Sequence, residues 1–399
     1  MRGLLKSARG LWPAVPISIV IGILCGLVGA GFYHAIAFVT ALREAQPWLI
    51  YLLPVGALAV FGWYRLWRTT PQTSVDTLLD GQTSGDCPKP TVAAALFGGT
   101  VLTHLFGGSS GREGAALLIG GGLAALCLRA VHTEKETRRT LMLAGMAALF
   151  AALFGTPVAA VFFVLELHHV GRMDLKALVV TLTASFIAYW LAGCLRVSPT
   201  RFALPDHLVP SFSAPVALRA LALALLCGGV SWLFVRVMHA ANDVAKIISP
   251  NVYLRSVLLG SAVLLVGLLS GTADYYGAGG GVIARAVHGE AVPLAFFMKI
   301  LLTALTLAAG YKGGEIVPAF FVGATFGCAV SPLLGLPAAF GGALGLVSVF
   351  AGVTNTPAAA VMLSAELFGG TYFPYFAIAA LVAMAASGHV SLYHRQVFD

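Results

Sequence analysis

At residues 107–115 the chain reads Gly-Gly-Ser-Ser-Gly-Arg-Glu-Gly-Ala, and an apolar run over residues 116–128 follows at once. Glycines at the start of a helix leave backbone amides bare, and these amides together with the helix dipole attract anions. Glu113 lies in the same turn, where its carboxylate would compete with an anion for those amides. We therefore interpret this stretch as part of an anion path that a protonatable carboxylate opens and closes.

The composition around this stretch is that of a membrane protein. Of the 399 residues, 59% are hydrophobic and 10% are charged, whereas a soluble domain carries about 25% charged residues. A β-barrel is excluded, because its strands alternate in polarity and run to only about ten residues. The sequence predicts an all-α integral membrane protein that crosses the membrane many times, in the inner (plasma) membrane of a bacterium.

The ends of the chain and its charge point the same way. Arg2, Lys6 and Arg9 precede the first apolar segment, and no Ala-x-Ala-like cleavage site follows. We expect residues 1–13 to be a cytoplasmic N-terminus, and we expect no cytoplasmic regulatory domain after the last apolar segment. The formal charge of +8 is spread over the ends of the segments, so we expect contact with membrane lipid and no nucleic acid. The six cysteines lack metal-ligand spacing, and we expect no metal and no cofactor.

The apolar segments form two sets on either side of a polar linker at residues 196–213. The first set is 14–41, 48–67, 73–80, 90–106, 112–128, 138–152, 156–168 and 174–194, and the second is 214–241, 252–271, 279–286, 291–309, 315–330, 337–352, 356–367 and 373–386. Several are shorter than the roughly twenty residues of a full span. Short helices of this kind line a protected interior, because unpaired backbone cannot face lipid.

The two sets match at an offset near 200 residues. Thr-Pro-Val-Ala-Ala-Val at 156–161 returns as Thr-Pro-Ala-Ala-Ala-Val at 356–361, and Gly-Arg-Glu at 111–113 has its counterpart in Gly-Gly-Glu at 313–315. Two equivalent halves with broken helices are typical of transporters whose site lies at the interface of the repeats. We therefore divide the chain into transmembrane repeats at 14–195 and 214–399.

Four glutamates lie in apolar surroundings, where a carboxylate must be paired, protonated or near water. For Glu166 and Glu366, at equivalent helix ends, we prefer capping or pairing to a proton relay. Glu315 begins its helix close to Lys312, which also favours a structural role. Glu113 differs, because its glycine loop lets the side chain move between the amides and a protonated, released state. Arg112 either draws anions in or forms a salt bridge to another glutamate.

Other polar side chains leave two readings open. Tyr393 follows the last apolar segment, so it is either a neutral hydroxyl ligand for an anion, in a chain that returns to the interior, or an interfacial tyrosine. His104, His168 and His169 lie near segment ends, and we expect them at the membrane interface. Residues 108–111 also fit the Gly-x-Ser-Gly pattern of rhomboid-like intramembrane serine proteases, with Ser110 as nucleophile and His389 as base. That pattern is short, and it explains neither the Arg-Glu pair nor the repeat.

Residues 107–115 resemble the Gly-Ser-Ser-Gly-Arg-Glu-Gly-Pro signature of the CLC chloride channel and anion/proton antiporter family. Gly-Gly-Glu-Ile-Val-Pro at 313–318 is similar to the second signature of that family. The resemblance covers the chain from about residue 14. It implies a CLC-type fold of two inverted helical repeats with many short, tilted and broken helices, assembled as a homodimer with one pore per subunit.

The resemblance also implies roles for individual residues. Glu113 matches the external gating glutamate, which also carries protons. The central-serine position falls on Val75, one residue beyond Ser74, and Tyr393 matches the inner hydroxyl ligand. The anion-binding residues that it implies are Ser74, Val75, Gly111, Arg112, Gly114, Ile316, Val317 and Tyr393.

Two departures bear on the transported ion. Val75 replaces a serine that favours chloride-like halides, and Leu167 stands where proton-coupled chloride exchangers carry an inner glutamate. Both are similar to the fluoride-exporting branch of the family, as are the surroundings of Asn355, which could contribute to selectivity. The methionine and threonines of that branch are absent at Val75, Val317 and Ala115. We predict a fluoride/proton antiporter; a chloride/proton antiporter and a passive chloride channel on the same fold are the alternatives.

Overall fold

A computed structural model describes residues 12–69, 75–84, 89–202, 204 and 208–398. Over these residues the regular structure is helical, and backbone pairing between segments is limited to isolated bridges. The predicted all-α class is confirmed.

The first half of the chain forms eight α-helices. They are α2 (Val15–Ala45), α3 (Leu53–Leu66), α4 (Val75–Ser84), α5 (Thr91–Phe106), α6 (Glu113–Cys127), α7 (Lys135–Phe154), α8 (Pro157–Glu166) and α9 (Leu178–Cys194). Short 3-10 helices, among them Pro47–Leu52 and Leu175–Ala177, adjoin them. Prolines at the first turns of α2, α3 and α8 fit these starts, since proline lacks only an amide that would be unpaired there.

The second half forms a matching series of eight. They are α10 (Ala214–Ile248), α11 (Val252–Leu269), α12 (Gly280–Val287), α13 (Ala295–Ala308), α14 (Ile316–Val330), α15 (Ala338–Thr354), α16 (Pro357–Phe368) and α17 (Phe373–Ser387). Most bounds agree with the predicted segments. The helix predicted to end at 241 instead continues to Ile248, because the first strong stop signal is Ser249, whose position before Pro250 disfavours helical backbone.

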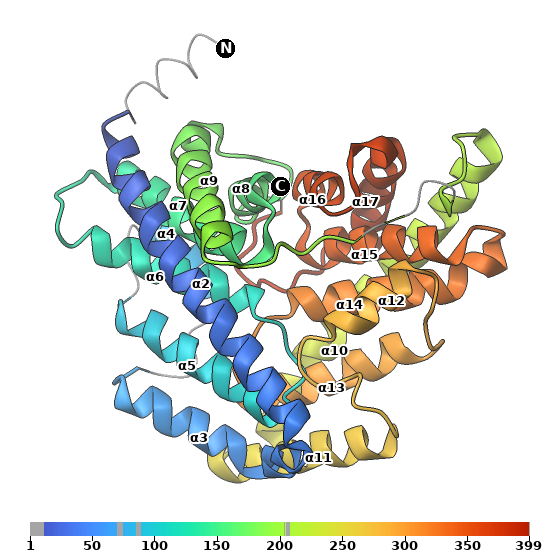
Figure 1. Cartoon of the computed structure of the whole chain (residues 1–399), viewed down its shortest axis with the longest axis horizontal. Helices are drawn as coiled ribbons and strands as arrows, with labels where there is room; N and C mark the ends of the chain where they lie inside the picture. Colours follow the sequence, from blue (N-terminus) through green and yellow to red (C-terminus); the bar gives the residue numbers. More distant parts are fainter. Residues whose placement is uncertain (1–11, 70–74, 85–88, 203, 205–207, 399) are drawn as a thin grey trace.

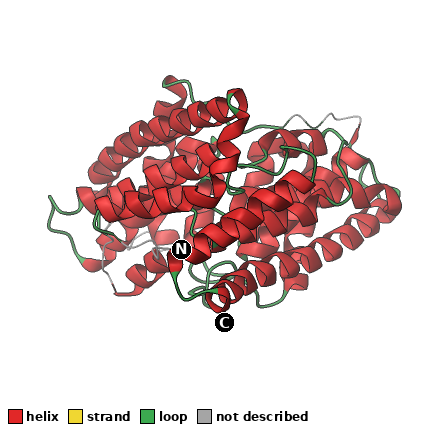
Figure 2. Ribbon diagram, turned by 90° about the horizontal axis from the view of Figure 1, so that it is seen from below, coloured by secondary structure: helices red, strands yellow, loops and turns green. Residues whose placement is uncertain are grey.

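The two halves lie side by side, with the cooler colours on the left of Figure 1 and most of the warmer colours on the right. Counterpart helices meet where the halves touch: α3 packs on α11, and α8 packs on α16. Seen from below, the helices run in several directions rather than as one parallel bundle (Figure 2). This arrangement brings the loops before α6 and α14 into the interior.

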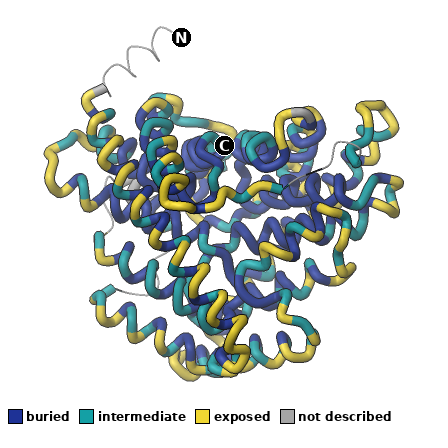
Figure 3. Tube along the Cα trace, viewed as in Figure 1, coloured by how far each residue is buried: buried dark blue, intermediate teal, exposed yellow. Residues whose placement is uncertain are grey.

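The interior is built from four helices that are buried nearly all round. Most residues of α6, α7, α14 and α15 are buried, including all of α7 from Thr140 to Phe154, and the buried part of the trace lies at the centre of Figure 3. Peripheral helices such as α2 and α11 instead expose apolar side chains, including Val20, Leu27 and Leu265. Seven helical segments of the described chain are long and apolar enough to cross a membrane. An apolar surface around a buried core is expected of a protein surrounded by lipid.

Glycines let these inner helices approach closely, and they do so twice in equivalent ways. A Cβ on Gly120 of α6 would overlap the carbonyl oxygen of Gly145 on α7, and a Cβ on Gly323 of α14 would overlap that of Gly345 on α15. Small residues allow backbones to pack in this way in membrane proteins. The matching contacts show that the offset near 200 residues is a repeat of packing as well as of sequence.

Candidate anion site

The loops that precede α6 and α14 are joined by a pair of backbone hydrogen bonds. The amide of Gly111 donates to the carbonyl of Gly314 at 2.7 Å, and the amide of Gly314 donates back to Gly111 at 2.8 Å. A Cβ on Gly114 would lie 2.9 Å from the Cα of Gly314, so a side chain there would push the loops apart. The bridge therefore sets the N-termini of the two helices next to one another, with the first-turn amides of each lacking helical partners.

The carboxylate of Glu113 is folded back onto its own loop. Its side chain is almost fully buried, and Oε2 accepts a hydrogen bond from the amide of Arg112 at 2.8 Å. The same oxygen lies 2.6 Å from where a Cβ on Gly111 would be, so only glycine leaves room for it there. Glu113 thus lies on an amide at the start of α6, where an anion would be attracted by the same dipole.

Arg112 is held by two partners rather than reaching across to a distant acid. Its Nε lies 3.5 Å from Oε1 of Glu113, and its guanidinium lies 4.8 Å from the centre of the Tyr33 ring. Of the two predicted roles, the salt bridge is present, but the partner is Glu113 itself and not another glutamate. The reason is local: both side chains leave the same turn at the start of α6.

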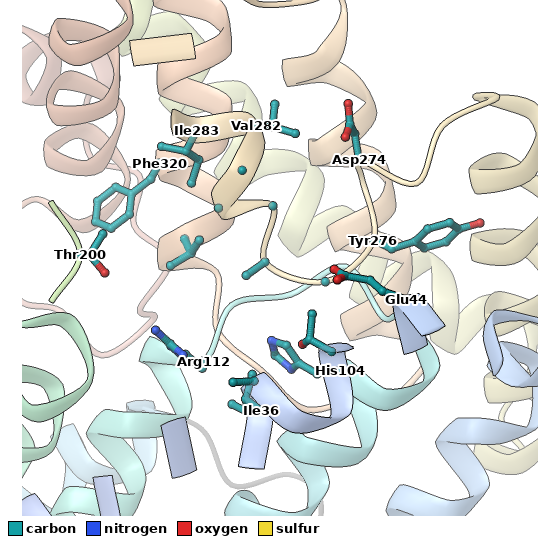
Figure 4. Close-up of a pocket in the computed structure, with 18 of the residues that line it drawn as sticks. Ile36, Glu44, His104, Arg112, Thr200, Asp274, Tyr276, Val282, Ile283 and Phe320 are labelled. Atoms are coloured by element: carbon teal, nitrogen blue, oxygen red, sulfur yellow. The ribbon is translucent and has the colours of Figure 1, made fainter. Parts of the chain in front are cut away.

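Glu113 is among the residues that line a cavity of about 580 Å³, and Figure 4 labels Arg112 and His104 in the wall of that cavity. Arg112 and Val317 line it together with Glu113, and the glycine segment 277–281 before α12 forms another part of its wall. Glu315 and Tyr393 do not line this cavity. The cavity therefore reaches the bridged loops from one side only.

His104 also lines this cavity, which contradicts its predicted place at the membrane interface. The residue is buried, its Nδ1 lies 3.0 Å from the carbonyl of Thr100, and its own carbonyl accepts from Arg43 at 2.6 Å. The prediction was wrong because α5 ends inside the protein at Gly107, and the end of a helix was taken for the edge of the membrane.

Two buried cations near the cavity were missed by the sequence reasoning. Lys299 of α13 is completely buried and donates to the carbonyls of Tyr275 at 3.2 Å and Gly277 at 2.6 Å, with Phe321 5.1 Å away. Arg43 is the other, bound to the carbonyl of His104. A charged residue within an apolar helix is a signal in itself, and Lys299 could have been found by it. Both side chains donate hydrogen bonds to backbone carbonyls of the cavity wall, and they place basic groups close to the cavity.

Tyr393 is buried on the other side of the bridged loops. Burial first, and then the negative charges of Glu315 before α14 and Asp76 of α4, raise the pKa of this phenol. The tail is fastened there because Asp76 accepts the amide of Arg395 at 3.0 Å. Of the two readings of Tyr393, the return of the chain to the interior is confirmed.

The remaining predicted anion ligands are Val75, Ser74 and Ile316. Val75 begins α4 and is buried, whereas Ser74 lies outside the described residues. Ile316 is the buried first residue of α14. The structure therefore brings Gly111, Gly114, Glu113 and Val317 together with Ile316 at the bridged helix starts, and it leaves Tyr393 near Asp76.

Asn355 is used to hold the tail. Its Nδ2 donates to the carbonyl of Val390 at 2.8 Å and to Oε1 of Gln396 at 3.1 Å. Gln396 in turn donates to the carbonyls of Leu167 at 3.1 Å and Thr354 at 2.8 Å. The backbone carbonyl of Leu167 therefore receives a neutral amide from the tail of the same chain.

Glu166 and Glu366 cap one another's helices across the two halves. The carboxylate of Glu366 accepts the amides of Val158 and Ala159 at the start of α8, at 3.1 and 2.8 Å. The carboxylate of Glu166 accepts those of Ala358 and Ala359 at the start of α16, at 3.3 and 3.1 Å. The structural role predicted for both is confirmed. Glu315 stands at the N-cap position of α14, and its structural role stays a prediction.

His168 and His169 follow α8 at a partly exposed turn, in keeping with the predicted position at a segment end. Their rings lie 4.5 Å apart, and the backbone of this turn pairs with Val397 of the tail. Among the described residues, no three His, Cys, Asp or Glu side chains are grouped closely enough to hold a metal ion.

Comparison with known proteins covers both halves of the chain. The family model described as voltage gated chloride channel matches residues 73–388. A chloride/fluoride channel protein of Pseudomonas syringae pv. tomato is 33% identical over 94% of this chain and 84% of its own. The crystal structure of a CLC-type fluoride/proton antiporter has a TM-score of 0.92 at 31% identity, covering 97% of this chain and 98% of the other. An H+/Cl− exchange transporter ClcA of Cronobacter sakazakii is 28% identical over 77% of this chain and 70% of its own.

Proposed function

The chain belongs to the voltage-gated chloride channel (CLC) family of anion transporters and channels, and on that premise we propose that it is a fluoride/proton antiporter. It is a multi-pass membrane protein and not an enzyme, which removes the rhomboid-like alternative. In the proposed mechanism Glu113 is both the gate and the proton carrier. Its carboxylate blocks the path when it binds the amide at the start of α6, and it leaves when it is protonated.

The single observation that supports the role of Glu113 is its hydrogen bond to the amide of Arg112. That bond places a carboxylate on a helix start between the cavity and the bridged loops. A carboxylate accepts such a bond more strongly than the neutral acid does, because charge strengthens it. Protonation would therefore weaken the contact and free the amide for an arriving anion, which links one proton to one movement of the gate.

Fluoride as the transported anion is supported by two features of the chain. Val75 is an apolar residue where a serine would favour larger halides, and Leu167 with Gln396 leaves the usual inner acid absent. In addition, the relatives at 33% and 31% identity are described as a chloride/fluoride channel protein and a fluoride/proton antiporter. Asn355 would influence selectivity only through the tail that it fastens.

We extend the proposal to the assembly and its surroundings. The halves at 14–195 and 214–399 would be inverted repeats around the bridged loops, and two copies would form a homodimer in the inner membrane of a bacterium. The anion would meet the amides near Gly111, Gly114, Ile316 and Val317 on the cavity side and Tyr393 on the other. The counterpart contacts of α3 with α11 and of α8 with α16 are what a repeat of this kind would produce.

The alternative of a chloride/proton antiporter has the exchange transporter at 28% identity in its favour, and that of a passive channel has the relative described as a channel protein. The experiment that separates the anions measures efflux of fluoride and of chloride from liposomes that contain the purified protein, with ion-selective electrodes. We expect fluoride to leave faster than chloride at equal concentration. Equal or reversed rates would favour the chloride alternatives.

A further inference from the structure

Two histidines join the C-terminal tail to α10. The rings of His239 on α10 and His394 on the tail are stacked, with centroids 4.2 Å apart and planes 25° from parallel. His239 is half-buried and its Nε2 is buried without a hydrogen-bond partner, whereas His394 is exposed. Tyr393 precedes His394 directly, so the stacked pair is the immediate neighbour in the chain of the buried phenol.

The surroundings of the pair disfavour two protons at once. His239 interacts electrostatically with Asp243 on its own helix, with Asp76 of α4 and with His394 of the tail, and it also faces the backbone of Leu392. Asp243 is already paired with Lys246 at 3.1 Å. Asp76 is therefore the carboxylate left to balance a positive charge, and a second proton on the pair would place two like charges at stacking distance.

The tail before His394 is held by neutral hydrogen bonds, whereas after it the amide of Arg395 donates to the carboxylate of Asp76. The hydroxyl of Ser391 accepts the amide of Tyr393 at 3.0 Å, and the amide of Leu392 donates to the carbonyl of Val353 at 3.1 Å. None of these bonds changes with pH over the range in which histidines gain protons, roughly pH 5 to 8. The pH response of the tail is thus concentrated at the two stacked rings.

We propose that His239 and His394 form a proton-binding pair that positions Tyr393 from the side opposite the cavity. With one proton or none, the stacked rings keep the tail against α10 and Tyr393 in place. With two protons the rings separate, the tail moves, and the phenol leaves the anion path. This inference rests on the proposed function, because it assigns pH control to the same transport path.

The transport test compares pH profiles of fluoride efflux in liposomes at about pH 7.5, 6 and 5. The variants are His394→Gln and His239→Gln, and the control is His389→Gln, an exposed tail histidine that packs on Phe398 instead. Because Glu113 titrates in all of them, the histidine effect is the difference between profiles. We expect efflux by the wild type and by the control to fall by roughly tenfold more at acid pH than efflux by either stack variant.

A second readout does not depend on transport. Hydrogen exchange of the peptide around residues 390–398, corrected for intrinsic pH dependence, should rise in the wild type below about pH 6 and stay unchanged in His394→Gln. Matching pH profiles for the wild type and both stack variants, or acid-insensitive exchange in the wild type, would overturn the inference. If the protein moves no fluoride at any pH but exchange still follows the prediction, the proposed function fails while the pH-sensitive pair stands.

Discussion

In the proposed mechanism, Glu113 is both the gate and the proton carrier. Its carboxylate is buried beside a cavity, it has an arginine as counter-charge, and it lies on a backbone amide that an anion would also bind. Burial favours the neutral acid, whereas the amide and the arginine favour the carboxylate. The surroundings of Glu113 therefore stabilise both protonation states in part. That balance allows the side chain to alternate between two positions.

Glu113→Gln should abolish proton movement, since glutamine keeps the shape of the side chain but cannot titrate. We expect proton uptake driven by anion efflux to fall by at least about tenfold, to background, while anion movement persists. Proton flux into liposomes is the measurement.

The control for that variant is Glu44→Gln, an exposed carboxylate in the wall of the same cavity. It should leave proton uptake unchanged. Coupled proton uptake by Glu113→Gln at the wild-type rate would refute the assignment of Glu113.

Tyr393→Phe should weaken anion binding on the tail side, because the substitution removes one hydroxyl donor from a buried phenol. A net hydrogen bond to an anion is worth roughly 1.5–3 kcal/mol, so we expect fluoride affinity to fall by about tenfold or more in calorimetry. Tyr375→Phe is the matched control, since that hydroxyl donates to the carbonyls of Pro210 and Ser211 away from the path. If both variants bind fluoride like the wild type, Tyr393 is a packing residue.

At the scale of whole elements, the two halves of the chain are joined by reciprocal helix caps. Each of α8 and α16 begins with a proline and has its free amides capped by a glutamate from the other helix. Carboxylates at helix starts also complement the dipole. One contact thus satisfies the polar groups of a short helix in the interior and ties together two segments about 200 residues apart.

Replacing either cap by glutamine should destabilise the protein without uncoupling transport. Glu166→Gln and Glu366→Gln each keep a neutral acceptor but lose the charge-assisted bonds to two amides, for an expected cost of about 1–3 kcal/mol. The measurement is the temperature of half-inactivation in detergent, together with coupled efflux at lower temperature.

Glu136→Gln serves as the control for the caps, because its pair with Lys176 at 3.2 Å is exposed. A surface pair of this kind is worth only about 0–1 kcal/mol. Loss of proton coupling by Glu166→Gln at unchanged stability would reopen the proton-relay reading of that residue.

At the scale of the whole molecule, the two sides of the bridged loops differ in chemistry. The cavity side holds Glu113, Arg112 and the buried cations, and the tail side holds Tyr393, Asp76 and the stacked histidines. The proposed antiporter would need two faces that open in turn, and this asymmetry would provide separate groups to control each face. The starts of α6 and α14, joined by the bonds between Gly111 and Gly314, lie between the cavity side and the tail side.

For the whole protein we predict that a fluoride gradient drives protons uphill. Liposomes loaded with fluoride and placed in fluoride-free buffer should take up protons without an added protonophore, even against a modest opposing pH gradient. External pH is the readout. Fluoride current that moves no protons would instead identify a passive channel and leave Glu113 as a gate alone.

Much of the fold was accessible from the sequence, because helix starts and lengths follow from local composition. Apolar runs predicted the sixteen α-helices of the described residues, with shifts of up to seven residues in their bounds. The offset near 200 residues predicted two equivalent halves, and the Gly-Arg-Glu turn singled out Glu113. The exposure of His104 was predicted wrongly, since a helix that ends inside a membrane protein looks in sequence like one that ends at its surface.

Sequence alone determined the class of the protein, its repeat and the carboxylate at the start of α6, all of which depend on neighbours along the chain. Only the tertiary structure decided that Gly111 bonds to Gly314 and that Glu166 and Glu366 each cap the helix of the other. It also decided that the tail returns to place Tyr393 near Asp76. These contacts join residues that lie far apart in the chain. Their formation depends on how helices pack across the whole interior, and local composition carries no record of that geometry.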